Sequence, residues 1–346
     1  MSKKPANALK SVKEMNSNTM LLMITIILFF VLYAGGCVAY ASRGFLTVQT
    51  FLNVLRSSAG LICVASGMTC VMLTGGIDIS VGSLVALDCM ILAYSMTEMN
   101  MSAPVAVILV LVLGLVFGLV QGFFIGYLQI QPFIVTMAGM FFARGMVAVI
   151  STAQLSITSG AFYDLATFRI YLPFGGTINR AGKMIMPYFG VGVIIAVVVL
   201  ILVFLMLRYT KFGRSLYAVG GNEQSAAMMG LNVKRTKMMA YVLCSLLCSI
   251  GGICYFLNTT SASVNQATGL EMDAIASAVI GGTLLTGGVG NVIGTLFGVL
   301  INGTIASIVQ FNGKLASSWP NILTAALLCF FIVLQSVFAL LKNRKK

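Results

Sequence analysis

Ten long apolar segments constrain this chain more than any other feature of its sequence. A helix needs about 20 mostly apolar residues to cross the hydrocarbon core of a bilayer. The segments that reach or approach this length are Met20–Ala41, Thr50–Leu73, Ile79–Thr97, Pro104–Leu128, Pro132–Ser151, Ile185–Arg208, Met238–Asn258, Glu271–Leu285, Gly290–Gln310 and Trp319–Leu341. The eighth segment is short for a span, so we expect it to be tilted, interrupted or only partly inserted. The sequence therefore predicts an all-α integral membrane protein with about ten transmembrane helices.

The composition excludes several functional classes. Only 8% of the 346 residues are charged, whereas soluble domains carry roughly 25% charged residues. The chain contains no histidine, which removes histidine-based acid–base catalysis and metal ligation. All eight cysteines lie within apolar segments and form no CxxC pair, a pattern that argues against a metal site. Without a Gly-x-Ser-x-Gly elbow or twin carboxylates on one span, we expect no enzymatic activity, no metal and no cofactor in this chain.

The net charge of +13 is interpreted as a signal of membrane orientation. With the N-terminus in the cytoplasm, fourteen of the 21 Lys and Arg fall on the cytoplasmic side, five fall outside, and Arg56 and Arg144 fall within spans. Cytoplasmic loops carry an excess of Lys and Arg, so we expect both termini in the cytoplasm and no nucleic-acid partner. Met20–Ala41 is predicted to be a retained anchor, because it starts late and has the length of a span.

The chain is predicted to form one transmembrane domain over residues 1–346. Its parts outside the spans are cytoplasmic tails at 1–19 and 342–346, an external loop at 152–184 and a cytoplasmic loop at 209–237. Long polar loops between tight spans are often functional.

Two glycine-rich turns resemble each other. Thr74–Leu84 (TGGIDISVGSL) aligns without gaps on Thr286–Leu296 (TGGVGNVIGTL). Each copy follows an inward-running segment and precedes an outward-running one, so the copies predict two related halves in parallel. Internal duplication with glycine-interrupted segments is typical of transporter cores. The alternative is that these glycines serve only tight helix turns.

Glycines and polar residues near these turns and within the spans are candidates for a substrate pathway or gate. Asp78 precedes a predicted helix, where it can cap backbone N–H groups or contact a solute. Asp88, Arg56 and Arg144 lie at apolar depth, where charges are costly and often functional. An ion pair between Asp88 and one of the arginines is an equal alternative. The candidates are Gly75, Gly76, Asp78, Ser80, Gly82, Asp88, Arg144, Gly287, Gly288 and Asn291.

A separate stripe of four glycines, Gly114, Gly118, Gly122 and Gly126, recurs every four residues. On a helix this spacing places all four on one face. Such a face lets a second helix approach closely. We therefore predict a helix-packing surface, which would also be smooth enough to slide if the span moves.

Four longer strings within residues 45–340 carry a family resemblance. They are Leu73–Ser83, Pro132–Gly145, Gly213–Gly230 and Ile280–Asn291. Together they resemble the integral-membrane permeases of ribose/xylose-type monosaccharide ABC importers. Within that family, Glu271–Leu285 and Phe311–Trp319 most resemble the galactofuranose-importer permease, which pairs with a second, different permease.

The resemblance implies a set of partners in the bacterial inner (plasma) membrane. These are a second permease subunit (a different chain, or otherwise a second copy), a cytoplasmic ATP-binding cassette ATPase and an extracytoplasmic sugar-binding protein. The chain has no GxxxxGK[ST] loop, so ATP hydrolysis would come from the partner. By analogy, the residues that couple to the ATPase are Gly220, Gly221, Asn222, Glu223, Ala226, Ala227 and Gly230. The alternative is that this loop is an ordinary solvated connector.

Other functions stay open at the level of sequence. Permeases of ABC importers for nucleosides or branched-chain amino acids share the broad superfamily. A zwitterionic solute would favour charged partners along its path, so the scarcity of charge favours a sugar. A stand-alone channel or secondary carrier is the remaining alternative.

Overall fold

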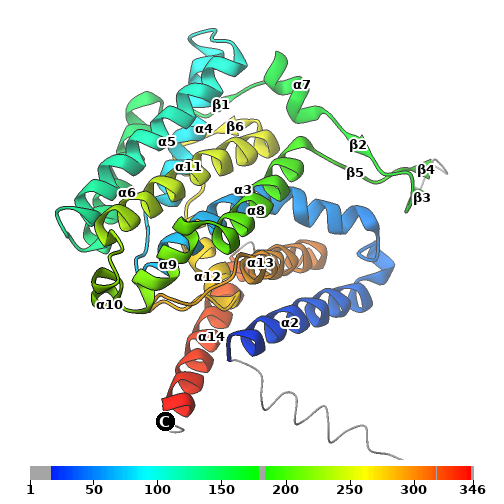
Figure 1. Ribbon diagram of the computed structural model, residues 1–346. Coiled ribbons are helices and arrows are strands. Elements are labelled where there is room, and N and C mark those ends of the chain that lie inside the picture. Colours follow the sequence, from blue (N-terminus) through cyan, green and yellow to red (C-terminus); the bar gives the residue numbers. More distant parts are fainter. Residues whose placement is uncertain (1–16, 179–183, 317, 344–346) are drawn as a thin grey trace, which may run out of the picture.

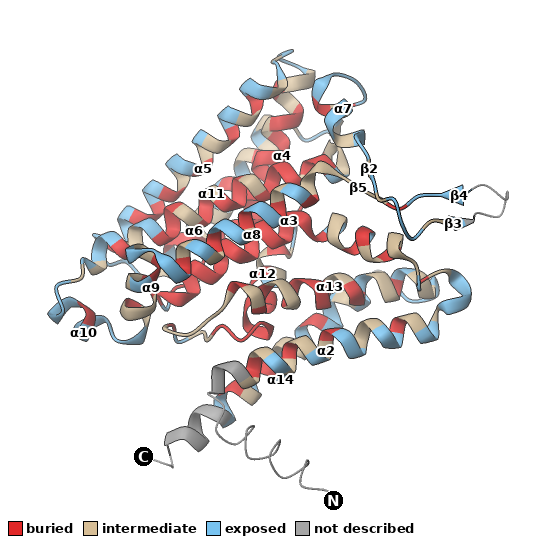
Figure 2. Ribbon diagram, turned by 45° about the vertical axis from the view of Figure 1, so that its right-hand side comes forward, coloured by how far each residue is buried: buried red, intermediate tan, exposed pale blue. Residues whose placement is uncertain are grey.

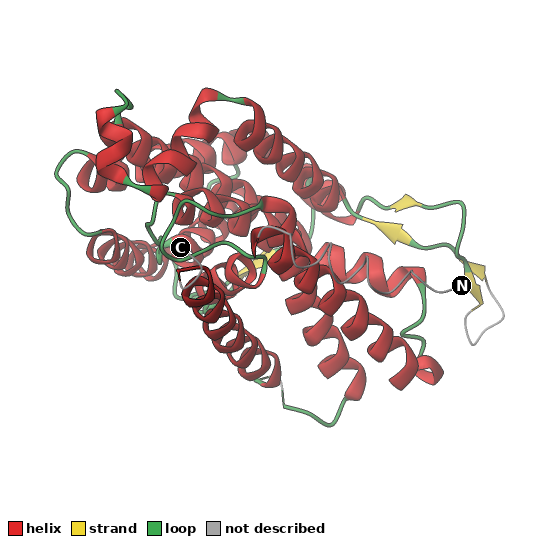
Figure 3. Ribbon diagram, turned by 60° about the horizontal axis from the view of Figure 1, so that its bottom comes forward, coloured by secondary structure: helices red, strands yellow, loops and turns green. Residues whose placement is uncertain are grey.

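The computed structural model describes residues 17–178, 184–316 and 318–343, and these are almost entirely helical (Figure 3). The long apolar helices are α2 (Ser17–Ala39), α3 (Val48–Leu73), α4 (Val81–Thr97), α5 (Ala103–Gly126), α6 (Pro132–Ile150), α8 (Val191–Tyr209), α11 (Val233–Thr259), α13 (Val292–Asn312) and α14 (Trp319–Asn343). Shorter helices are η1 (Ala41–Arg43), α7 (Ala161–Thr167), α9 (Lys211–Gly221), α10 (Glu223–Met228) and α12 (Leu270–Ile280). Most of the predicted tails, 1–16 and 344–346, lie outside the described residues.

Within the described residues, eight helices are long and apolar enough to cross a bilayer: α2, α3, α5, α6, α8, α11, α13 and α14. Two predicted spans are shorter. The segment Ile79–Thr97 contains α4 of 17 residues, which starts at Val81. The segment Glu271–Leu285 contributes only α12, whose 11 residues end at Ile280. The prediction of a multi-pass helical membrane protein is therefore confirmed, with interruptions at these two segments.

The expected loops contain secondary structure. Three antiparallel pairs of two-residue strands form: β1 (Leu155–Ser156) with β6 (Ser261–Ala262), β2 (Ile170–Tyr171) with β5 (Tyr188–Phe189), and β3 (Thr177–Ile178) with β4 (Met184–Ile185). The predicted span Ile185–Arg208 was therefore placed too early, because strands β4 and β5 precede α8. The span predicted to start at Met238 begins at Val233, because Asn232 caps α11 by accepting from the Arg235 backbone N–H at 3.0 Å.

The core lies around α3 and α11 (Figures 1 and 2). In the most apolar stretches of these two helices, 78% and 72% of the residues are buried. The corresponding fractions are 22% in α5, 28% in α8 and 17% in α14. The outer helices expose large aliphatic and aromatic side chains such as Ile108, Phe141 and Leu202. Apolar side chains can face outward at low cost only where lipid or another membrane helix replaces water, so the exposed faces of α2, α5, α6, α8 and α14 are suited to a membrane.

The glycine stripe of α5 packs against α11, as predicted. A Cβ atom added at Gly118 would lie 2.8 Å from Val242 Cα, and one added at Gly122 would lie 2.6 Å from the Met238 carbonyl oxygen. These distances leave no room for a side chain, so the two backbones are in direct contact. The stripe stabilises the bundle by allowing this close approach.

Replacing Gly122 with Leu is expected to force α5 away from α11. Overpacking of this kind costs about 1–3 kcal/mol or more, so we expect a clearly lower thermal midpoint of the detergent-solubilised protein. The matched control is Val120→Leu, because Val120 is 50% exposed on the outer face of α5. Equal midpoints for both variants would contradict the packing role.

Candidate functional site

The two ends of the bundle are named here by their short helices. The α7 end carries α7 and the segment 260–269 between α11 and α12. Strand β6 of this segment pairs there with β1. The α10 end carries α9 and α10 together with both glycine turns, because Gly220 of α9 lies against Leu73 and Gly288. The two copies of the repeat thus bring their turns to the same end.

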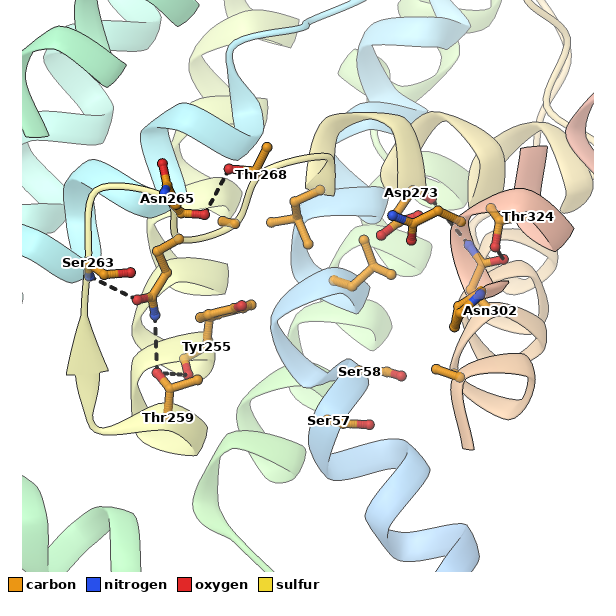
Figure 4. Close-up of a pocket in the computed structure, with 18 of the residues that line it drawn as sticks. Ser57, Ser58, Tyr255, Thr259, Ser263, Asn265, Thr268, Asp273, Asn302 and Thr324 are labelled. Carbon is orange, nitrogen blue, oxygen red and sulfur yellow. Dashed lines mark hydrogen bonds between the residues drawn. The ribbon is translucent and has the colours of Figure 1, made fainter. Parts of the chain in front are cut away.

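A polar concavity of about 590 Å³ lies between α3, the segment 260–269, α12, α13 and α14. Its walls are mostly hydroxyl and amide side chains (Figure 4). The polar residues that line it are Ser57, Ser58, Tyr255, Thr259, Ser261, Ser263, Asn265, Gln266, Thr268, Asp273, Asn302, Asn321 and Thr324. Asp273 is the one ionisable carboxylate among the described lining residues, and these residues include no Lys or Arg.

Hydrogen bonds fix much of this wall. The Gln266 side chain donates to the Ser261 carbonyl oxygen at 2.9 Å and accepts from the Ser263 backbone N–H at 3.1 Å. On the opposite side, Asn302 Nδ2 donates to Ser277 Oγ at 3.0 Å, and Thr324 Oγ1 donates to Asn302 Oδ1 at 3.2 Å. The cavity is therefore preformed, with polar groups held in place on both sides.

Arg144 stabilises one wall of this cavity through hydrogen bonds to the backbone of that wall. It projects from α6 and donates to the carbonyl oxygens of Gln266 at 2.7 Å and Val264 at 3.2 Å. These carbonyls belong to the segment 260–269, so Arg144 positions a cavity wall and does not itself line the cavity. The assignment of Arg144 to a pathway or gate stays a prediction; relative to this cavity, Arg144 lies one layer behind the wall.

Asp88 does not form the ion pair considered as an alternative. Among the described residues, the one ion pair within 4 Å joins Lys237 and Glu223. Asp88 is fully buried against Gly252 of α11, and neither of its carboxylate oxygens has a hydrogen-bond partner there. Arg56 lies instead near the α7 end, beside Tyr163 and Asn258.

The first turns of α4 and α12 meet. A Cβ atom added at Gly82 would lie 3.0 Å from the Ala267 carbonyl oxygen and 3.2 Å from the Glu271 backbone nitrogen. Gly82 thus provides space for the start of α12. Two interrupted helices that meet at their N-terminal turns are an arrangement typical of transport proteins.

Asp78 does not cap α4 as predicted: the N-cap residue is Ser80, which has no side-chain cap hydrogen bond, and Asp78 bonds to Ser80 in the turn before the helix. Its Oδ1 accepts from the Ser80 backbone N–H at 3.0 Å and from Ser80 Oγ at 2.6 Å, whereas Oδ2 is buried without a partner. Gln121 of α5 donates to Ser80 Oγ at 3.1 Å. Sequence reasoning missed Gln121, although a lone amide within an apolar span was a usable signal.

The glycine turns and the predicted coupling loop meet at one junction. The Gly288 backbone N–H donates to the Leu73 carbonyl oxygen at 2.9 Å. A Cβ atom added at Gly287 would lie 2.7 Å from the Gly75 nitrogen, and one added at Gly220 would collide with the Leu73 carbonyl oxygen. Gly75, Gly287 and Gly288 also have φ angles of +77°, +85° and +73°, which favour glycine. Residues predicted separately for gating and for coupling are thus in backbone contact.

Side chains reinforce the same junction. The Tyr217 hydroxyl of α9 donates to the Gly290 carbonyl oxygen at 3.0 Å, and burial raises the pKa of Tyr217. Asn291 caps α13 by accepting from the Ile293 backbone N–H at 2.9 Å. At Gly76, Tyr241 of α11 occupies the space that a Cβ atom would need. The turns are therefore fixed to α9, α11 and α13.

The loop predicted at 209–237 is mostly helical. Asn222 caps α10 by accepting from the Ser225 backbone N–H at 2.7 Å, and Glu223 pairs with Lys237 at 2.7 Å. At the other end of α10, Gly230 has φ +81°, and its N–H and that of Leu231 donate to the carbonyl oxygens of Ala227 and Ala226 respectively. This pair of bonds is a glycine-terminated helix end. Ala226 is buried, and Ala227 is exposed.

Two methionines stand out at the tip of α10. Met228 is 88% exposed and Met229 is 69% exposed. Both lie outside the span-length helices. Exposed methionines away from the lipid-facing belt are typical of protein-binding surfaces.

Comparison with known proteins adds a family. Residues 50–333 match a family model described as "Branched-chain amino acid transport system / permease component". The chain is 39% identical to the inner membrane ABC transporter permease protein YjfF of Escherichia coli, over 94% of each protein. It is 34% identical to the fructose import permease FruG of Bifidobacterium longum, over 89% of this chain and 87% of FruG. It is 35% identical to the ribose import permease RbsC of Escherichia coli, over 86% of this chain and 88% of RbsC. No solved structure matches significantly.

Adjacent glycines provide a matched test of the junction. Gly220→Ala is expected to separate α9 from the first glycine turn, because its Cβ atom would overlap the Leu73 carbonyl oxygen. Gly221→Ala meets nothing within 4 Å and should be tolerated. We expect a loss of about 1–3 kcal/mol for the first variant only, measured as thermal midpoints in detergent. If both variants behave like the parent protein, the contact is not tight.

Proposed function

The chain belongs to the family of branched-chain amino acid transport system permease components, and on that premise we propose that it is the membrane permease of an ATP-driven monosaccharide importer. Its similarity to fructose and ribose import permeases over most of the chain supports this class of substrate. The observation that carries the proposal is the cavity of hydroxyl and amide groups between α3, α12, α13 and α14.

The chemistry of the cavity favours a sugar over an amino acid. Sugar hydroxyls both donate and accept hydrogen bonds, as do the Ser, Thr, Asn and Gln side chains on the walls. The carboxylate of an amino acid would need a cation or several N–H donors, because burying an unpaired charge is costly. The described lining contains no basic side chain. Galactofuranose is our proposed sugar, and nucleosides and branched-chain amino acids are the alternatives.

We further propose that the α10 end faces the cytoplasm and the α7 end faces outward. The six basic residues Arg208, Lys211, Arg214, Lys234, Arg235 and Lys237 lie at or near the α10 end, and the positive-inside rule favours that side for them. Both termini would then be cytoplasmic. The cavity, lined by segment 260–269 and the start of α14, would face an extracytoplasmic sugar-binding protein.

The helices α9 and α10 are our candidate surface for an ATPase subunit, in a complex with a second permease subunit. Exposed Met228 and Met229 offer an apolar contact outside the membrane. From there, α9 reaches both glycine turns through Gly220. A displacement of α9 driven by ATP binding would move the turns only if the ATPase contacts differ between its states.

Thr324→Trp is expected to obstruct the cavity and lower sugar uptake at least about tenfold. The matched control is Val333→Trp, because Val333 is 57% exposed on the same helix. Uptake of radiolabelled galactofuranose, galactose and ribose would be measured in cells that express the chain with its ATPase, binding protein and second permease. An ATPase with an inactivating mutation gives the background.

The outcomes separate the candidate functions. Uptake lost in Thr324→Trp and retained in Val333→Trp supports the pathway, and dependence on the ATPase supports an ABC importer. Unchanged uptake in a stably expressed Thr324→Trp protein would place the path elsewhere. Uptake of leucine or a nucleoside, with none of the sugars, would favour an alternative solute.

A second test addresses coupling. Met228→Asp combined with Met229→Asp should weaken ATPase binding and reduce uptake about tenfold or more, because two charges replace an apolar contact. Met99→Asp is the control, since Met99 is 55% exposed at the other side of the bundle, after α4. Co-purification of the ATPase with the permease is the readout. Full co-purification and uptake in the double variant would contradict docking at α10.

A further inference from the structure

We infer that the Asp273 carboxylate is the specificity-determining group of the cavity, accepting hydrogen bonds from neighbouring hydroxyls of a neutral sugar and excluding anionic solutes such as sugar acids. This inference rests on the proposed function, because it assumes that the cavity holds the transported solute. The inference goes beyond the proposed function in two respects: it names one residue that selects the solute, and it states that the solute must not be anionic.

The position of Asp273 within the cavity is the first argument. Figure 4 shows Asp273 beside Asn302 and Thr324, with Ser57 and Ser58 on the facing helix. The described lining contains twelve neutral polar side chains but no cation that could neutralise a carboxylate. The one ion pair among the described residues lies elsewhere, between Lys237 and Glu223. The carboxylate is thus free to act on whatever enters the cavity.

The local fold explains how this charge is tolerated and held. Asp273 lies in the first turn of α12, where the helix N-terminus favours negative charge. Its backbone carbonyl oxygen accepts from Ser277 Oγ at 2.7 Å. Ser277 in turn accepts from Asn302, which accepts from Thr324. A chain of hydrogen bonds from α14 through α13 therefore fixes the helix that presents Asp273.

Glu271 supplies a contrast on the same turn of helix. Two residues correspond to roughly 200° around a helix, so Glu271 points away from the direction of Asp273. Its Oε2 atom is buried against Gly82 of α4, without a hydrogen-bond partner among the described residues. Glu271 does not line the cavity. It is therefore a matched carboxylate at nearly the same depth but outside the proposed site.

The chemistry follows from charge and geometry. A carboxylate has two oxygens that accept hydrogen bonds, and bonds to an ionised group are stronger than neutral ones. Two adjacent hydroxyls of a sugar ring can donate to such a pair of oxygens. An anionic solute would instead meet a like charge in a partly desolvated space, where repulsion is poorly screened. A branched-chain amino acid could place its ammonium on Asp273 but would leave its carboxylate without a cation.

The first arm of the test measures the electric field of the cavity. In Ser57→Cys, the new thiol lines the same cavity, and its reaction rates with cationic and anionic methanethiosulfonates are compared in the assembled transporter. The parent protein corrects for its native cysteines. We expect the cationic reagent to react roughly tenfold faster. Adding Asp273→Asn should lower this ratio severalfold and adding Asp273→Glu should preserve it, whereas Glu271→Gln, which removes a nearby charge outside the lining, should lower it less than Asp273→Asn.

The second arm measures transport at a saturating concentration of loaded binding protein. Asp273→Asn should reduce sugar uptake about tenfold, the loss expected for one or two charge-assisted hydrogen bonds. Asp273→Glu should retain part of the uptake, and Glu271→Gln should retain most of it. Size-exclusion profiles check folding. If Asp273→Asn is misfolded, Asp273→Ser removes the same charge with a smaller side chain.

The two ways of failing are distinguishable. If the Ser57→Cys thiol reacts with neither reagent, the cavity is closed to water and the proposed pathway is overturned together with the role of Asp273. If the thiol reacts but Asp273→Asn changes neither the rate ratio nor the sugar uptake, the proposed pathway stands and the role of Asp273 is overturned. A changed ratio with unchanged uptake also overturns it, because hydroxyl binding would then not involve the carboxylate.

Discussion

Backbone polar groups have no water to bind in the hydrocarbon core, and this constraint organises the whole molecule. Irregular backbone is tolerated at that depth only where it is enclosed by protein. Two bonds satisfy backbone groups at the breaks after α3 and after α12: the Gly288 N–H donates to the Leu73 carbonyl oxygen and joins the two breaks, and the Leu284 N–H donates to the Val289 carbonyl oxygen at 3.0 Å within the second break. The surrounding helices shield both breaks, since α3 and α11 are the most buried spans.

Packing the two breaks together has a mechanical consequence. Glycines are required where the turns touch, because any side chain at Gly220 or Gly287 would overlap the backbone of a neighbouring segment. The segments in contact are the end of α3 with its glycine turn, α9, and the glycine turn before α13, which are distant in sequence. On the proposed coupling, a movement of α9 would be transmitted through backbone contacts, which cannot rearrange as readily as side chains. Such a rigid junction suits a device that must respond to a partner at one end.

The sequence predicted the helices better than the site, for a physical reason. Hydropathy detects that a segment is apolar but not where it leaves the helix, so Glu271–Leu285 was predicted to be tilted, interrupted or only partly inserted, and the structure shows the interruption at Gly281. The glycine turns were recognised because their pattern is local. The cavity was missed, because Ser57, Asp273, Asn302 and Thr324 are isolated polar residues on four different apolar helices. Only the tertiary fold brings them together.

Strong binding inside the membrane would work against transport, because a tightly held solute leaves slowly. A cavity of neutral hydroxyls and amides offers many exchangeable hydrogen bonds without a deep minimum. A second charged side chain would change this balance. A Lys or Arg paired with Asp273 would leave the carboxylate unable to bind sugar hydroxyls. A second carboxylate would favour a solute that carries a positive charge. One unpaired carboxylate, fixed by the Ser277–Asn302–Thr324 chain, can orient a neutral sugar and still release it. On the proposed function, affinity would belong to the sugar-binding protein, and the permease would supply selection by charge.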